Sequence, residues 1–182
     1  FMWVVVITAG LLSVKNIVVG RFNIALFLGF LTLITTNPLW YAIGVMKSKK
    51  SYTSSFLTKY LIIHMSIILL GSFMLAYGLF FVETSVQYLM IFFGVLGILD
   101  IRELIRTKSM RTSRPDWYKV HYSGMITTGI AAYTAFFAFG GRRFFENILI
   151  NEWQLLPWIL PTLIGILCIR IMDHRRKRTL AG

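Results

Sequence analysis

Two histidines of this sequence each lie a few residues inside an otherwise apolar stretch. His64 follows "KYLII" and His121 follows "DWYKV". A third apolar stretch ends in "GILD" at Asp100, with Arg102 and Glu103 after it. Ionisable side chains are costly inside a bilayer, so such residues are the first candidates for chemistry. If these stretches are helices that end at one membrane depth, we expect the five side chains to form one polar layer.

Three kinds of chemistry are open to this layer. It can join helices through hydrogen bonds and ion pairs near the membrane surface, where long side chains reach water. Two neutral imidazoles on different helices can be the axial ligands of a haem. His121 together with Asp100 can carry out proton or quinone chemistry. The cofactor site predicted for a haem or a quinone comprises His64, His121, Asp100, Met125 and Trp117.

The elements that position these residues are predicted to be transmembrane helices. Of the 182 residues, 57% are hydrophobic and 14% are charged. A helix needs roughly 20 apolar residues to cross a bilayer. The apolar stretches cover residues 2–14, 22–46, 60–82, 86–105, 121–140 and 155–172. The sequence therefore predicts an all-α, polytopic membrane bundle of about six helices, a single transmembrane domain over residues 1–182 with a basic tail at 173–182.

The net charge of +12 is distributed unevenly along the chain. All but four of the 19 lysines and arginines fall in alternate connections or after the last apolar stretch. The four exceptions are Lys15, Arg21, Arg142 and Arg143. The positive-inside rule places both termini and the basic connections in the cytoplasm. The basic cluster "DHRRKR" is then expected from topology, and no nucleic-acid partner is predicted.

Small residues on the fifth stretch predict close packing with another helix. Gly124, Thr128, Ala132 and Ala135 recur at helical spacing on the face of His121. Small side chains let helix backbones approach in a membrane. The leading functional hypothesis is therefore a non-enzymatic membrane subunit that packs against other membrane proteins in a larger assembly.

Two alternatives remain open beside that hypothesis. The first is a haem- or quinone-linked redox protein that uses His64 and His121. The second is a small-solute transporter, for which the break at Asn37 and Pro38 inside an apolar stretch is the one positive sign. The sequence contains no HExxH, CxxC, GxSxG or Walker A motif, so no catalytic residue and no metal site are predicted.

Three ordered blocks resemble a family of uncharacterised membrane proteins. They are "YLMIFFGVLGILDIRELIRTK", "DWYKVHYSGMITTGIAAYTAFFAF" and "LLPWILPTLIGILCIRIM". Their pattern is similar to the C-terminal part of the DUF2306-type predicted bacterial membrane proteins. The matching residues are Asp100, Trp117, His121, Met125, Thr134, Ala135, Phe136, Trp158, Pro161, Thr162 and Gly165. The resemblance implies a bacterial inner-membrane protein with a further histidine-bearing helix upstream of Phe1, but it implies no reaction.

Overall fold

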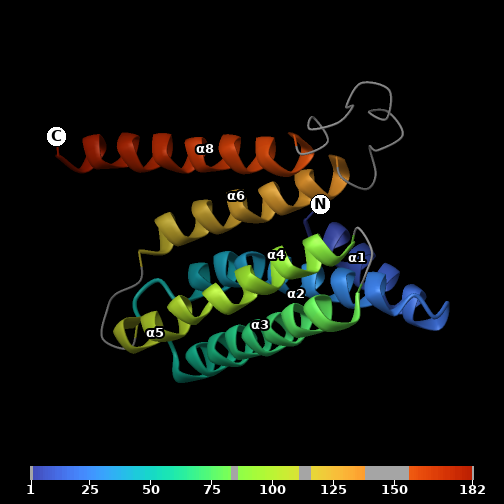
Figure 1. Cartoon of the computed structure of the whole chain (residues 1–182). Helices are drawn as coiled ribbons and strands as arrows, with labels where there is room; N and C mark the ends of the chain where they lie inside the picture. The colour runs from blue at the N-terminus through green and yellow to red at the C-terminus, as the bar shows by residue number, and fades with distance from the viewer. Residues whose placement is uncertain (1, 83–85, 111–115, 138–155, 182) are drawn as a thin grey trace.

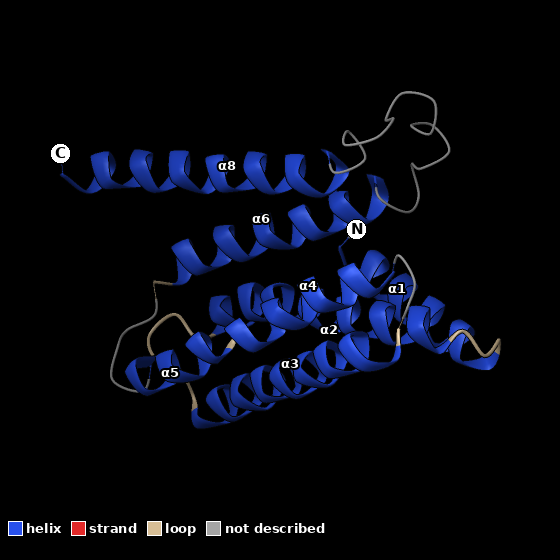
Figure 2. Cartoon of the chain, viewed as in Figure 1, coloured by secondary structure: helices blue, strands red, loops and turns tan. Residues whose placement is uncertain are grey.

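The computed structural model describes residues 2–82, 86–110, 116–137 and 156–181, and these form helices without strands (Figure 2). The helices are α1 (Met2–Val18), α2 (Phe22–Lys47), α3 (Ser54–Phe81), α4 (Val86–Leu99), α5 (Ile101–Met110), α6 (Trp117–Ala135) and α8 (Leu156–Ala181). A single residue separates α4 from α5. Counted as one interrupted helix, these two leave six helical segments over the described residues, so the all-helical prediction is confirmed.

Capping side chains explain why two helices begin earlier than the apolar stretches do. The Thr53 hydroxyl accepts a hydrogen bond from the Phe56 amide at 3.4 Å, so α3 begins at Ser54 rather than at residue 60. The Asp116 carboxylate accepts one from the Lys119 amide at 3.3 Å, and α6 begins at Trp117 rather than at residue 121. Apolar patterning misses such polar first turns. Of the predicted helix ends, residues 138–140 and 155 lie outside the described residues.

The prediction of an uninterrupted helix over residues 86–105 is wrong. The helical hydrogen bonding changes at Asp100. Its amide donates to the Gly97 carbonyl at 3.3 Å, which lies three residues back instead of the four of an α-helix. The Asp100 carbonyl then accepts from the Glu103 amide at 2.9 Å, where α5 starts. The sequence becomes polar after this junction, from "VQYLMIFFGVLGIL" to "IRELIRTKSM", but Ile101, Leu104 and Ile105 continued the apolar pattern and the break was missed. The turn matters because it fixes the direction of the Asp100 side chain.

The basic segment after the last apolar stretch is not a separate tail. The predicted tail at 173–182 is helical through Ala181 and continues α8 without a break. Its first turn contacts α6, where Lys119 Nζ lies 3.1 Å from the Asp173 carboxylate. This side-chain contact stabilises the helical continuation.

The helices pack in a row with α2 near its middle (Figure 1). α2 contacts α1, α3, α4 and α6, while α6 also contacts α8. α3 and α4 pack against each other as consecutive antiparallel helices. Gly20 turns the chain between α1 and α2 with a φ of 76°, a left-handed conformation that favours glycine.

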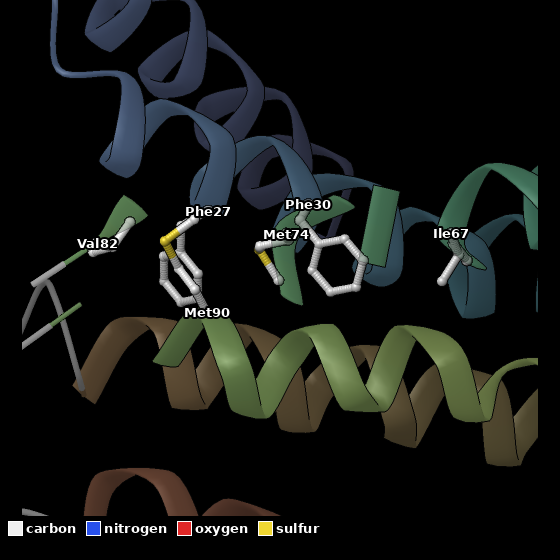
Figure 3. Close-up of a cluster of buried hydrophobic side chains, with 6 residues drawn as sticks. All are labelled: Phe27, Phe30, Ile67, Met74, Val82 and Met90. Carbon is white, nitrogen blue, oxygen red and sulfur yellow. The ribbon is translucent and has the colours of Figure 1, made fainter. Parts of the chain in front are cut away.

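A cluster of buried apolar side chains joins the central helices (Figure 3). Phe27 and Phe30 come from α2, Ile67 and Met74 come from α3, and Met90 comes from α4. Phe30, Ile67, Met74 and Met90 are fully buried. Van der Waals contacts among these side chains hold the three helices together. The cluster fixes the mutual positions of α2 and α3, which carry Asn37 and His64, and of α4, which ends one residue before Asp100.

Two helices of the described chain, α2 and α3, are long and apolar enough to cross a membrane. α2 has 26 residues and α3 has 28, with mean hydropathies of 1.5 and 1.9 over their most apolar windows. Large apolar side chains also remain outside the core. Leu69 and Phe80 of α3 are 66% and 78% exposed, and Ile7 of α1 is 58% exposed. Apolar exposure on this scale marks a surface that contacts lipid or another protein.

Glycines let α3 and α4 approach until their backbones touch. A Cβ atom at Gly97 would lie 2.9 Å from the Gly71 Cα and 2.9 Å from the Phe30 ring. A Cβ atom at Gly94 would lie 2.8 Å from that of Leu75. No side chain fits at these contacts without a shift of one helix.

We expect Gly97→Ala to lower the free energy of unfolding by about 1–3 kcal/mol, because the added methyl group overpacks the α3–α4 contact. Reversible unfolding of the purified protein in mixed detergent micelles measures this. Gly129→Ala is the matched control, since its Cβ would meet only the Met2 methyl group, at 3.6 Å. A Gly97→Ala variant as stable as this control would contradict the packing.

Candidate functional site

A buried hydrogen bond joins α3 to the break between α4 and α5. Nδ1 of His64 lies 2.5 Å from Oδ2 of Asp100, and the two side chains are only 3% and 18% exposed. Nδ1 carries a proton that it donates to the carboxylate, so the other ring nitrogen, Nε2, is the one left for other partners. The structure therefore brings together two of the residues that the sequence assigned to one polar layer.

An asparagine of α2 occupies the other side of the His64 ring. The Asn37 amide nitrogen lies 3.4 Å from Nε2, at the long end of hydrogen-bond distances. Its amide oxygen is buried without a hydrogen-bond partner among the described residues. Asn37 precedes Pro38, so the sequence marked this position only as a helix break. A polar amide within an apolar helix was the signal for a site residue.

A second set of hydrogen-bonded side chains, Tyr60, Glu103 and Arg106, lies beside His64 and Asp100. The buried Tyr60 hydroxyl donates to the Glu103 carboxylate at 2.6 Å, and the same oxygen accepts from Arg106 at 3.3 Å. The Tyr60 and His64 rings lie next to each other, with centroids 4.1 Å apart. Tyr60 and Arg106 were not predicted as site residues. Tyr60 lies one turn before His64 on the same helix, and that spacing is the sequence signal for it.

These two sets of hydrogen-bonded side chains line one cavity of about 600 Å³. α2, α3, α5 and α6 contribute to its wall. The wall includes the polar side chains Asn37, Tyr41, Tyr60, His64, Asp100, Glu103 and Arg106. This volume is within the range of sites that bind small organic molecules. The hydroxyl groups of Tyr41 and Tyr52, which also lines the cavity, lie 3.0 Å apart and form a hydrogen bond.

Charged groups in the wall pair with one another or with α8. Besides the Glu103–Arg106 pair, Lys119 bonds Asp173 at 3.1 Å, and Arg176 bonds the Asp116 carboxylate. The hydrogen bond from Arg176 lowers the pKa of Asp116, because it stabilises the carboxylate form. Asp173 also accepts a hydrogen bond from the Tyr122 hydroxyl. α8 therefore packs against the start of α6 through polar contacts. Two of the residues in these contacts, Asp116 and Lys119, also line the cavity.

His121 lies apart from the cavity wall. Its Nδ1 donates to the Ala42 carbonyl of α2 at 2.9 Å, and the residues lining the cavity do not include it. His64 lines the cavity, with Nδ1 bonded to Asp100 and Nε2 in a long contact with Asn37. The structure therefore does not present the two imidazoles to one cavity. The two axial ligands of a haem must face each other across it, and this pair does not.

The other predicted site residues have separate surroundings. Trp117 lies beneath the Lys49 ammonium, which is 4.5 Å from the ring centroid. Met125 is half-buried on α6, and Arg102 is exposed on α5. None of the three lines the cavity. Of the five residues of the cofactor site predicted from the sequence, His64 and Asp100 line the cavity.

The small-residue face of α6 packs within the chain. A Cβ at Gly124 would lie 2.8 Å from the Ala42 Cβ and 2.9 Å from the Pro38 carbonyl oxygen of α2. Thr128 and Ala132 are buried, and Ala135 is half-buried. This face therefore brings α6 close to α2, and its first buried positions are not available to an external partner.

Comparisons with family models, with curated proteins and with solved structures each find no match to this chain. The resemblance to DUF2306-type proteins therefore stays a prediction, and the function has to be argued from the site.

A double-mutant cycle measures the His64–Asp100 bond directly. We expect His64→Ala and Asp100→Ala to be coupled by about 1–3 kcal/mol in the free energy of unfolding, because either change alone leaves a buried polar group without its partner. The reference cycle pairs Asp100→Ala with His121→Ala, two residues without a shared partner, and should be additive. Additive effects of His64→Ala and Asp100→Ala would contradict the hydrogen bond.

Proposed function

We propose that this chain is an integral membrane protein whose cavity beside His64 binds the head group of a quinone. In this proposal all six helical segments cross the bilayer of a bacterial inner membrane, and both termini and the basic connections face the cytoplasm. The cavity then opens near the cytoplasmic surface of the membrane.

Exposed apolar surface and charge asymmetry support the membrane part of the proposal. Outward side chains such as Ile7, Leu69 and Phe80 need an apolar environment, and lipid supplies one. The basic connection after α2 and the basic end of α8 fall on one side if every segment crosses. The turn at Gly20 falls on the opposite side, where the chain has few cations.

The single observation that carries the quinone proposal is the position of His64 between Asn37 and Asp100 in the cavity wall. Asp100 fixes the imidazole and its tautomer, as a strong acceptor for Nδ1–H does. The contact of Nε2 with Asn37 is long, at 3.4 Å, so a ligand oxygen can compete for the space beside it. We assign His64 as the residue that hydrogen-bonds one quinone oxygen. With both ring nitrogens protonated, it donates Nδ1–H to Asp100 and Nε2–H to that oxygen.

Charge pairing and aromatic lining favour an uncharged ring over a charged solute. Glu103 pairs with Arg106, and Asp100 is bonded to His64, so both carboxylates already have a partner in the wall. The rings of Tyr41 and Tyr60 lie 5.1 Å apart and make this part of the wall aromatic, which suits an uncharged ring. A quinone head combines such a ring with two hydrogen-bonding oxygens.

Proton exchange is the chemistry that these residues provide. A quinone takes up protons at its oxygens when it is reduced. A histidine hydrogen-bonded to a carboxylate can hold or release a proton next to such an oxygen. Glu103 is more exposed than Asp100, at 36% against 18%, and Tyr60 links it to the ring of His64.

The two other hypotheses lose the observations that favoured them. The small-residue face around Gly124, which supported a subunit of a larger assembly, packs against α2 of the same chain. The break at Asn37 and Pro38, which supported a transporter, has a local role because Asn37 contacts His64. Quinone binding is the function that uses the polar groups of the cavity.

Cysteine accessibility tests the membrane topology. In a Cys168→Ser background, we expect an impermeant maleimide to label Val19→Cys from outside intact cells, and Lys50→Cys only in inverted vesicles. Both positions are exposed, so failure to react reports sidedness rather than burial. Labelling of Lys50→Cys from outside intact cells would overturn the orientation.

Quinone affinity tests the site. We expect His64→Ala to weaken the binding of decylubiquinone to the purified protein by about five- to tenfold, because it removes one ligand hydrogen bond. His121→Ala is the matched control and should bind as the parent does, since His121 lies outside the cavity wall. Quenching of tryptophan fluorescence measures the affinity. Equal affinities for the parent and the His64→Ala variant, or no saturable binding by the parent, would contradict the proposal.

A further inference from the structure

α8 presents two different faces. α6 is the one helix that α8 contacts in the described part of the chain. Asp173 and Arg176 point to that contact, where they bond Lys119, Tyr122 and Asp116. The rest of the α8 surface is without a helical neighbour among the described residues.

The uncovered face changes from apolar to basic within one turn. Its first part carries the exposed side chains Leu160, Leu163, Ile164, Leu167 and Ile171. Its last part carries the exposed side chains Arg170, His174, Lys177 and Arg178. Because α8 is one continuous helix, the basic part lies directly along the axis from the apolar part. A rise of 1.5 Å per residue puts about one turn between Ile171 and His174.

The only carboxylate of α8 is held on the opposite face. Asp173 is bonded to Lys119 at 3.1 Å and to the Tyr122 hydroxyl, both on α6. Its hydrogen bonds and its ion pair within the described residues are therefore made to α6 and not to Arg170 or Arg178 on the uncovered face.

We propose that the uncovered end of α8 is a binding surface for the head groups of anionic phospholipids. An apolar face gives way within a turn to cations that form no ion pair among the described residues. This matches one leaflet, whose hydrocarbon is bounded by phosphate groups. Arg170, Lys177 and Arg178 reach these phosphates while the alkyl parts of their side chains cover the adjoining apolar surface. This inference rests on the membrane insertion proposed above and is independent of the cavity and its ligand.

The lipid preference of the full-length protein tests the proposal. The protein is reconstituted in phosphatidylcholine vesicles, and the motional restriction of spin-labelled phosphatidylglycerol is compared with that of spin-labelled phosphatidylcholine. The variant Arg170→Gln/Lys177→Gln/Arg178→Gln removes three cations from α8. The control Lys47→Gln/Lys50→Gln/Lys59→Gln removes three exposed cations, one each from the end of α2, the α2–α3 connection and α3.

We expect the parent and the control to prefer phosphatidylglycerol severalfold, and the α8 variant to lose most of that preference. The parent preference should also fall at 1 M salt, which screens exposed charges. An α8 variant that keeps the parent preference, or a control that loses as much as the α8 variant does, would overturn the proposal. Flotation with the vesicles reports insertion separately, so a protein that floats without this preference contradicts the lipid surface alone.

Discussion

The hydrogen bond between His64 and Asp100 is the constraint on which the site depends. It lies between apolar helices, where an unpaired carboxylate or imidazole costs far more than a paired one. The break at Asp100 directs the carboxylate toward α3, and the glycine contact between Gly71 and Gly97 brings α3 and α4 close enough for the bond to form. Packing and chemistry are therefore set by the same pair of helices.

α2 connects this bond to the rest of the molecule. Asn37 contacts His64 on one side, while Ala42, little more than a turn later, accepts the hydrogen bond of His121 and touches the position of Gly124. The helix thus places one histidine at the cavity and holds the other against its own backbone. Two histidines that look equivalent in the sequence acquire different roles because they meet different faces of α2.

The helical architecture was predictable from the sequence, since long apolar stretches bounded by polar residues have few other structures. Shared membrane depth also put His64 and Asp100 in one group before any contact was known. The break at Asp100 and the separate partner of His121 were not predictable, because apolar content does not report a local turn or the direction of a side chain around its helix. Asn37 and Tyr60 each carried a sequence signal, but the pattern alone did not show which way either side chain faces. Each lies at the cavity only because of how α2 and α3 are rotated.

The account makes His64, and not His121, the residue that contacts a quinone in the cavity. The most direct test is a ¹⁵N solid-state NMR spectrum of histidine-labelled protein in bilayers, recorded with and without decylubiquinone and assigned with single His→Gln variants. The account predicts that the Nε2 resonance of His64 moves on addition of the quinone, while Nδ1 of His64 stays hydrogen-bonded and the His121 resonances stay in place. A shift confined to His121, or no shift at either residue at saturating quinone, would contradict it.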